Sequence, residues 1–200
     1  MIDLNIINNK FSIILKEIAN NNIFMDHICE NYSLRDKYTP MRMSQIFSAF
    51  EFVYKRNYGI NYSRSEYYIN IKKEVLESIG LLKSLKKRNR KEIKSLDSIS
   101  NYLKHYDDSY ATKVFTTISE NENLIKSFLI NKKVISNDLK DISDRLGLLR
   151  NRIQHGNMDY YYDEIIFDIK ILEVIYYIIL LKSVGIKNIH IKKAIKKLFQ

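Results

Sequence analysis

Apolar residues recur along most of this chain every three or four positions, which is the spacing of one face of an α-helix. The pattern predicts helices over about Asn8–Ala19, Thr39–Gly59, Ser63–Gly80, Ile93–Tyr106, Tyr110–Phe128, Ser136–Gly156, Tyr160–Val184 and Asn188–Phe199. Within the fifth segment Val114, Thr116 and Thr117 would also suit a β-strand, so that alternative stays open. Five glycines and one proline leave few turns. We therefore expect an all-α protein with long helices and additional short ones.

The clearest helical pattern lies in the last third of the chain. Its apolar positions alternate in steps of three and four residues: Leu139, Ile142, Leu146, Leu149 and Ile153. Gly156 follows, and glycine suits the left-handed position that ends many helices. The next helix, Tyr160–Val184, is apolar on most sides in its second half and should therefore lie at the centre of the fold.

Composition and charge narrow the class of protein. The chain has 200 residues, 46% of them hydrophobic and 28% charged, which excludes a disordered chain. A formal net charge of +10 suggests a polyanionic partner. The single cysteine, Cys29, excludes a disulfide framework and a Cys-rich zinc site within the chain. Neither a signal peptide nor an uncharged stretch long enough to span a bilayer is evident, so we expect a cytoplasmic protein without membrane contact.

The residues that point to chemistry lie where the last two large helices meet. Arg150 is followed directly by Asn151, and His155 comes five positions after the arginine, just before a glycine. A histidine near its usual pKa of about 6.5 exchanges protons at neutral pH. An arginine offers two parallel donors to the oxygens of a phosphate. Together they are suited to cleaving a phosphodiester.

This motif resembles that of the HEPN superfamily, in which an Arg, often followed by Asn, precedes a His by four to six residues at the end of the third bundle helix. More narrowly, the chain is similar to the ApeA-type HEPN domain of prokaryotic anti-phage proteins. The segment Met43–Glu51, followed by Arg56, resembles that group's first bundle helix, and Leu180–Gly185 resembles its last. The resemblance covers roughly residues 38–200, which we expect to form a HEPN-like helical bundle. Residues 1–37 would be an N-terminal helical segment of unassigned role.

The resemblance implies a metal-independent endoribonuclease without a cofactor, acting in anti-phage defence or as a toxin. Carried over to this chain, His155 is the general acid/base, Arg150 stabilises the transition state and Asn151 orients the site. It also implies a homodimer that pairs two motifs, and a regulatory or neutralising protein partner. The alternative is a non-catalytic RNA-binding or protein-interaction module on the same scaffold.

One stripe of the motif helix bears on the homodimer. Ser143, Gly147 and Arg150 share it, and a glycine inside a helix costs about 1 kcal/mol relative to alanine. Such a cost suggests a close approach. Either a partner helix or a neighbour within the same chain would explain it.

Further residues are candidates for binding RNA. They are Arg152, Lys86, Lys87, Arg88, Arg90 and Tyr160. A basic run is as often a solvated helix face, and most aromatic residues here follow core spacing. No cluster of acidic or histidine residues clearly forms a metal site, and His27 beside Cys29 favours a buried or capping role.

Overall fold

The computed structural model describes residues 7, 10–29, 32–59, 66–84, 88–105, 109–131, 139–157 and 163–199. In these ranges the chain forms α2 (Phe11–Ala19), a 3-10 turn (Tyr32–Leu34), α3 (Pro40–Tyr58), α4 (Glu66–Ser84), α5 (Arg90–His105), α6 (Tyr110–Asn131), α7 (Leu139–Gln154), α8 (Ile165–Ser183) and α9 (Asn188–Phe199). No β-strand occurs among the described residues, so the all-α class is confirmed. The segment that could have been a strand is the helix α6.

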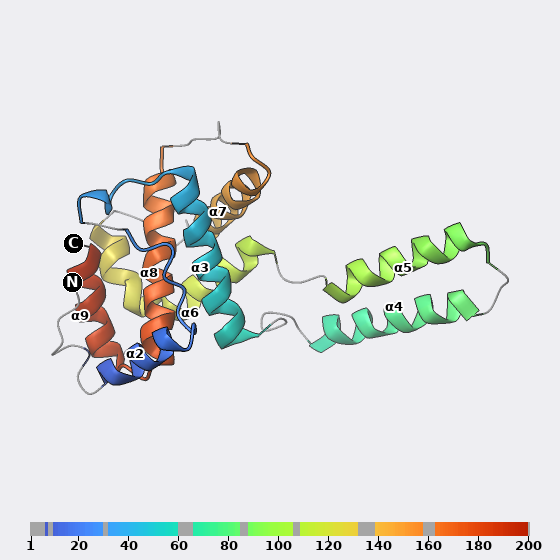
Figure 1. The fold of residues 1–200 in the computed structure, drawn as a ribbon, viewed down its shortest axis with the longest axis horizontal. Coiled ribbons are helices and arrows are strands. Elements are labelled where there is room, and N and C mark those ends of the chain that lie inside the picture. The colour runs from blue at the N-terminus through green and yellow to red at the C-terminus, as the bar shows by residue number, and fades with distance from the viewer. Residues whose placement is uncertain are drawn as a thin grey trace. The chain divides into compact units, whose positions relative to one another are not determined.

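The chain forms two compact units. One consists of Met1–Gly59 together with Ser109–Gln200, and the other is the intervening Ile60–Asp108. The first unit is a bundle built from α2, α3 and α6 to α9, and the second contains α4 and α5 (Figure 1).

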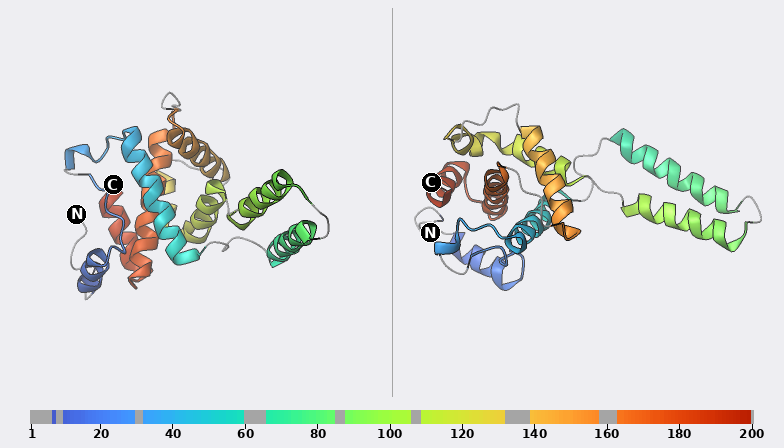
Figure 2. Two further views of the ribbon diagram at one scale, coloured as in Figure 1. Left: turned by 45° about the vertical axis from the view of Figure 1, so that its right-hand side comes forward. Right: turned by 90° about the horizontal axis from the view of Figure 1, so that it is seen from above.

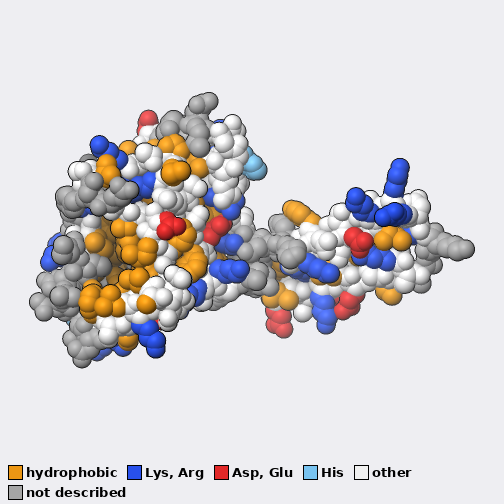
Figure 3. Space-filling view, viewed as in Figure 1, with side chains coloured by type: hydrophobic (Ala, Val, Ile, Leu, Met, Phe, Trp, Pro, Cys, Tyr) orange, Lys and Arg blue, Asp and Glu red, His pale blue; other side chains and the backbone are white. Residues whose placement is uncertain are grey.

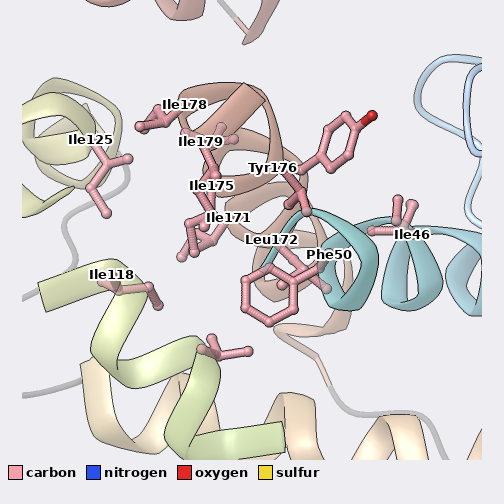
Figure 4. Packing of buried hydrophobic residues seen from close by; sticks show 14 of the residues in the cluster. Ile46, Phe50, Ile118, Ile125, Ile171, Leu172, Ile175, Tyr176, Ile178 and Ile179 are labelled. Atoms are coloured by element: carbon pink, nitrogen blue, oxygen red, sulfur yellow. The ribbon is translucent and has the colours of Figure 1, made fainter. Parts of the chain in front are cut away.

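The bundle is organised around α8, which lies between α3, α6 and α9 (Figures 1 and 2). Its residues are apolar on nearly every side, so neighbouring helices can cover it all round. Ile171 and Ile175 are fully buried, as are Phe50 from α3 and Ile118 from α6, which pack in the same core (Figure 4). The expectation that this helix is central is confirmed.

Local sequence signals explain several helix ends. Thr39 precedes α3 and its hydroxyl accepts a hydrogen bond from the Arg42 amide at 3.3 Å, while Pro40 occupies the first helical position. Two boundaries differ from the expectation by four residues or more. α4 continues through Gly80 to Ser84, and α8 begins at Ile165 instead of Tyr160. Asp163 and Glu164 form a turn before α8, and residues 158–162 lie outside the described residues.

Buried ion pairs fix the register of the bundle helices. Asp168, fully buried on α8, accepts two hydrogen bonds from Arg145 of α7 at 2.7 and 2.9 Å. Glu173, also on α8, accepts from Arg42 at 2.9 Å and from the Tyr38 hydroxyl at 2.7 Å. Because a buried carboxylate is costly without its partner, these contacts select one helix arrangement.

The N-terminal segment belongs to the same bundle. The Tyr176 hydroxyl on α8 donates to the Phe24 carbonyl at 2.7 Å, and Arg56 on α3 pairs with Glu17 on α2 at 2.6 Å. Contacts therefore divide the chain at residues 59/60 and 108/109, whereas the sequence suggested a boundary at 37/38.

The second unit is an antiparallel pair of helices, α4 and α5 (Figure 2). Asn89 caps α5, since its side chain accepts from the amides of Lys91 and Glu92 at 3.0 Å, and its own amide donates to Glu92 at 2.9 Å. None of the described helices is long and apolar enough to cross a bilayer.

Candidate functional site

The motif occupies the C-terminal end of α7, where the helix closes in a well-defined backbone turn. Gly156 adopts φ +77°, its amide donates to the Ile153 carbonyl at 3.1 Å, and the Asn157 amide donates to the Arg152 carbonyl at 2.9 Å. This pair of reversed bonds is the Schellman motif. His155 is the last residue before the left-handed glycine, so the backbone that carries the imidazole is held in one conformation.

The Arg150 side chain contacts residues of α3, α6 and its own helix, α7. Its guanidinium donates to Glu51 of α3 at 3.0 Å and to the adjacent Asn151 side chain at 3.3 Å. The guanidinium carbon also lies 5.8 Å from the centre of the Tyr110 ring of α6. The Arg150 side chain is 25% exposed, so the charge reaches solvent while most of the side chain is enclosed.

Tyr110 packs beside the Arg150 guanidinium. Its ring packs edge-on against Phe47 and Phe50, and its hydroxyl is buried with no hydrogen-bond partner among the described residues. Burial raises the pKa of Tyr110 well above its usual value; Glu51 raises it further and Arg150 opposes the shift. The phenol therefore stays protonated and remains a potential donor beside the guanidinium.

Asn151 and His155 are both exposed and lie four residues apart on one stripe of the helix end. Arg150 and His155 are five residues apart, which corresponds to about 140° around the helix axis. The arginine accordingly faces α3 and α6, and the histidine faces solvent on another side. Asn151 contacts both residues: its side-chain oxygen accepts from the Arg150 guanidinium, and its backbone carbonyl accepts from the His155 backbone amide at 3.1 Å.

The structure shows which neighbour approaches α7 closely at Gly147: it is a helix of the same chain. Ser143 and Gly147 are buried, and a Cβ atom added at Gly147 would lie 3.1 Å from the Ala111 Cβ and 3.3 Å from its backbone nitrogen. Gly147 thus allows α7 to approach the start of α6. The alternative explanation, close approach of a partner helix, is wrong at this position.

The other candidate RNA-binding residues have separate surroundings. Arg152 is exposed on α7. Arg88 and Arg90 belong to the second unit, where the Arg88 Nε donates to the Leu82 carbonyl at 2.7 Å and Arg90 is exposed at the start of α5. Lys86, Lys87 and Tyr160 lie outside the described residues.

Two residues of the site, Glu51 and Tyr110, were not identified from the sequence. Glu51 directly follows the buried Phe50 and reads as a surface charge at the edge of an apolar stripe. Tyr110 reads as one more core aromatic. Their proximity to Arg150 depends on how α3 and α6 pack against α7, and no local pattern encodes that.

The described residues include no group of three or more His, Cys, Asp or Glu side chains arranged to hold a metal ion. In comparisons with known proteins, no family model, no curated protein and no solved structure matches the chain.

Proposed function

We propose that this protein is a metal-independent endoribonuclease of the HEPN type. The observation that carries the proposal is the Arg150-Asn151 pair five and four residues before His155 at the closed end of α7, with the arginine anchored by Glu51 and the histidine exposed. An anchored guanidinium and an accessible imidazole are the two groups that RNA cleavage through the ribose 2′-hydroxyl requires.

The reaction is a transesterification within the substrate. The 2′-oxygen forms a bond to the adjacent phosphorus while the bond from phosphorus to the 5′-oxygen breaks. One proton leaves the 2′-hydroxyl and one is delivered to the 5′-oxygen, giving a 2′,3′-cyclic phosphate and a 5′-hydroxyl. His155 takes part in this proton exchange, one imidazole for each transfer, and Arg150 stabilises the added charge on the phosphate oxygens.

The contacts of Arg150 set a condition on substrate binding. Two of its nitrogens already donate, one to Glu51 and one to Asn151, and Nε has no partner among the described residues. A bidentate contact with phosphate needs two donors on one edge of the guanidinium. The 3.3 Å contact with Asn151 is the longer of the two and is the one that should yield, while Glu51 keeps the arginine in place.

A homodimer is part of the proposal. One histidine cannot easily serve both proton transfers, and a two-fold axis beside the exposed stripe of Asn151 and His155 would supply a second. Arg152, Lys86, Lys87, Arg88, Arg90 and Tyr160 are proposed RNA contacts. By its resemblance the protein would act in the cytoplasm in anti-phage defence or as a toxin, under the control of a regulatory or neutralising protein.

One observation favours the alternative, a non-catalytic RNA-binding or interaction module. Arg150 is only 25% exposed and has two contacts within its own chain, which is also what a structural arginine at a helix end would show. The exposed His155 side chain has no contact of this kind among the described residues.

Alanine substitutions separate these possibilities. In a cleavage assay with the purified chain and a mixed RNA substrate, His155→Ala and Arg150→Ala should each lower the rate at least about 100-fold, and Arg150→Lys should recover little. Arg152→Ala, with the same charge change on the same helix, should weaken RNA binding at most. Full cleavage by His155→Ala would refute the proposed role of this residue.

A further inference from the structure

The second unit buries very little of its own apolar surface. Among its described residues only Ile79 and Ser100 are buried, both in the seam between α4 and α5. A unit of this size rarely supplies a sufficient core by itself, and helical hairpins normally bury their remaining apolar face against another element. The question is what covers the rest of this hairpin.

A set of apolar side chains lies outside the seam. Tyr67, Ile71, Val75, Leu82 and Ile99 are between 39% and 75% exposed, and we call them the hairpin stripe. The α4 members are separated by four, four and seven residues, which places them on one side of that helix. Single exposed apolar residues are common, but a run at helical spacing along a whole helix is not.

The two helices present their stripe residues on the same side of the hairpin. Around the axis of α4, the stripe residues lie about 100° from the residues that face α5. Around the axis of α5, Ile99 lies at a similar angle from the residues that face α4. Because the two helices are antiparallel, these rotations place both sets on the same side of the hairpin. The polar contacts across the hairpin fit the opposite side: Lys83 pairs with Asp97 at 2.7 Å, and Lys72 donates to the Lys104 carbonyl at 3.3 Å.

We propose that the hairpin stripe is an interface between two copies of this chain, in which two α4–α5 hairpins pair face to face as a four-helix bundle. Tyr67 is 75% exposed and the other four residues are 39% to 50% exposed, so pairing two hairpins would cover surface on the order of 1,000 Å². That approaches the ~1,200 Å² at which specific protein interfaces begin. Four of the five stripe residues are aliphatic and offer RNA neither hydrogen-bond donors nor an aromatic ring, so the stripe is better suited to a protein surface than to nucleic acid.

Charge favours an arrangement with the two hairpin tips at opposite ends. The tip half, where α4 ends and α5 begins, carries Lys83, Arg88, Arg90, Lys91 and Lys94 against Glu77, Glu92 and Asp97, whereas the other half carries Lys72, Lys73 and Lys104 against Glu66 and Glu74. Lys and Arg side chains on the hairpin are visible in Figure 3. An antiparallel pairing keeps the two more basic tips apart and sets each against the less basic half of its partner.

Two neighbouring leucines give a matched test. Leu82 belongs to the stripe, whereas Leu81 is 59% exposed and lies about 100° away around α4, facing away from α5. Sedimentation velocity of the full chain at micromolar concentrations should show a dimer for the wild type and for Leu81→Glu, and at least a tenfold weaker dimer for Leu82→Glu. A monomeric wild type, or equal dimerisation of both variants, would overturn the interface.

A second measurement covers the case in which Leu82→Glu loses helicity by circular dichroism. With Cys29→Ser as background, Val75→Cys at the middle of the stripe should form a disulfide-linked dimer under mild oxidation, and Leu81→Cys should form it at least tenfold more slowly. Equal cross-linking would contradict the proposal. The inference does not rest on ribonuclease activity, and neither readout involves RNA. Equal behaviour of the paired variants would remove the hairpin interface alone, whereas a monomeric wild type would also remove the homodimer of the proposed function.

Discussion

The Arg150 guanidinium on α7 lies 3.0 Å from the Glu51 carboxylate on α3, a contact between residues 99 positions apart in the sequence. The pair is partly open to solvent, with side chains 25% and 35% exposed. An ion pair of this exposure contributes at most about 1 kcal/mol to folding. Its larger effect is geometric, because it holds a long and flexible side chain in one orientation beside Tyr110 and Asn151.

Replacing Glu51 tests whether it positions Arg150. Glu51→Gln keeps an acceptor for the guanidinium and should retain cleavage within about threefold, whereas Glu51→Ala should lose about 10- to 100-fold through the misplaced arginine. Glu17→Ala is the control, since it removes an ion pair, with Arg56 at 2.6 Å, that does not involve Arg150. Faster cleavage by Glu51→Ala would mean that Glu51 competes with phosphate for the arginine.

The sequence was most informative about residues that are close together in the chain. The end of α7 follows from an apolar repeat and Gly156, and both Arg150 and His155 were identified from that local context. Glu51 could not be paired with Arg150 in the same way. Several arginines lie on other helices of the chain, and only the packing of the bundle selects the one that meets Glu51.

Gly147 should be intolerant of larger residues for an intramolecular reason. Gly147→Val would force α7 away from Ala111 and should lower the stability of the bundle by about 1–3 kcal/mol. Gly80→Val is the matched control, because Gly80 also lies within a helix, α4, and a Cβ atom there meets nothing within 4 Å. Thermal unfolding followed by circular dichroism compares the two. Equal melting temperatures would show that α7 and α6 tolerate a wider separation.

Because His27 is buried, we expect the protein to lose stability in mild acid. It is 2% exposed, its ring lies 4.4 Å from that of Tyr176, and neither ring nitrogen has a hydrogen-bond partner among the described residues. Burial and the nearby Arg42 charge lower its pKa from 6.5 to about 4, although the Phe24 backbone partly opposes the shift. The unfolded chain therefore takes up this proton first, so stability is full above pH 6.5 and falls between pH 6.5 and 4.

The loss from this one group is about 3 kcal/mol across that range. His27→Phe should remove it, and the difference between variant and wild type in urea unfolding should grow as pH falls. Carboxylates titrate in both proteins and cancel in the comparison. A constant difference from pH 7 to pH 4 would show that folding does not lower the pKa of His27.

Helix existence was easier to predict than helix ends. Gly80 suggested a stop, yet α4 runs through it, because one glycine costs only about 1 kcal/mol and Ile79 is anchored in the seam with α5. Tyr160 suggested the start of the last long helix, which begins at Ile165 after a turn. The division into a bundle and a hairpin was also missed, since nothing in the composition marks residues 59/60 or 108/109.

The chemistry of the cut is the most direct test of the proposed function. The purified chain is incubated in excess chelator with an RNA and with the same RNA carrying a single 2′-deoxyribose at the cut site. Because the nucleophile is the substrate's own 2′-hydroxyl, the RNA should be cut to a 2′,3′-cyclic phosphate and a 5′-hydroxyl, and the substituted RNA should bind but stay intact. Ends bearing 5′-phosphate, cleavage of the substituted strand, or inhibition by chelator that added divalent metal reverses would contradict the mechanism.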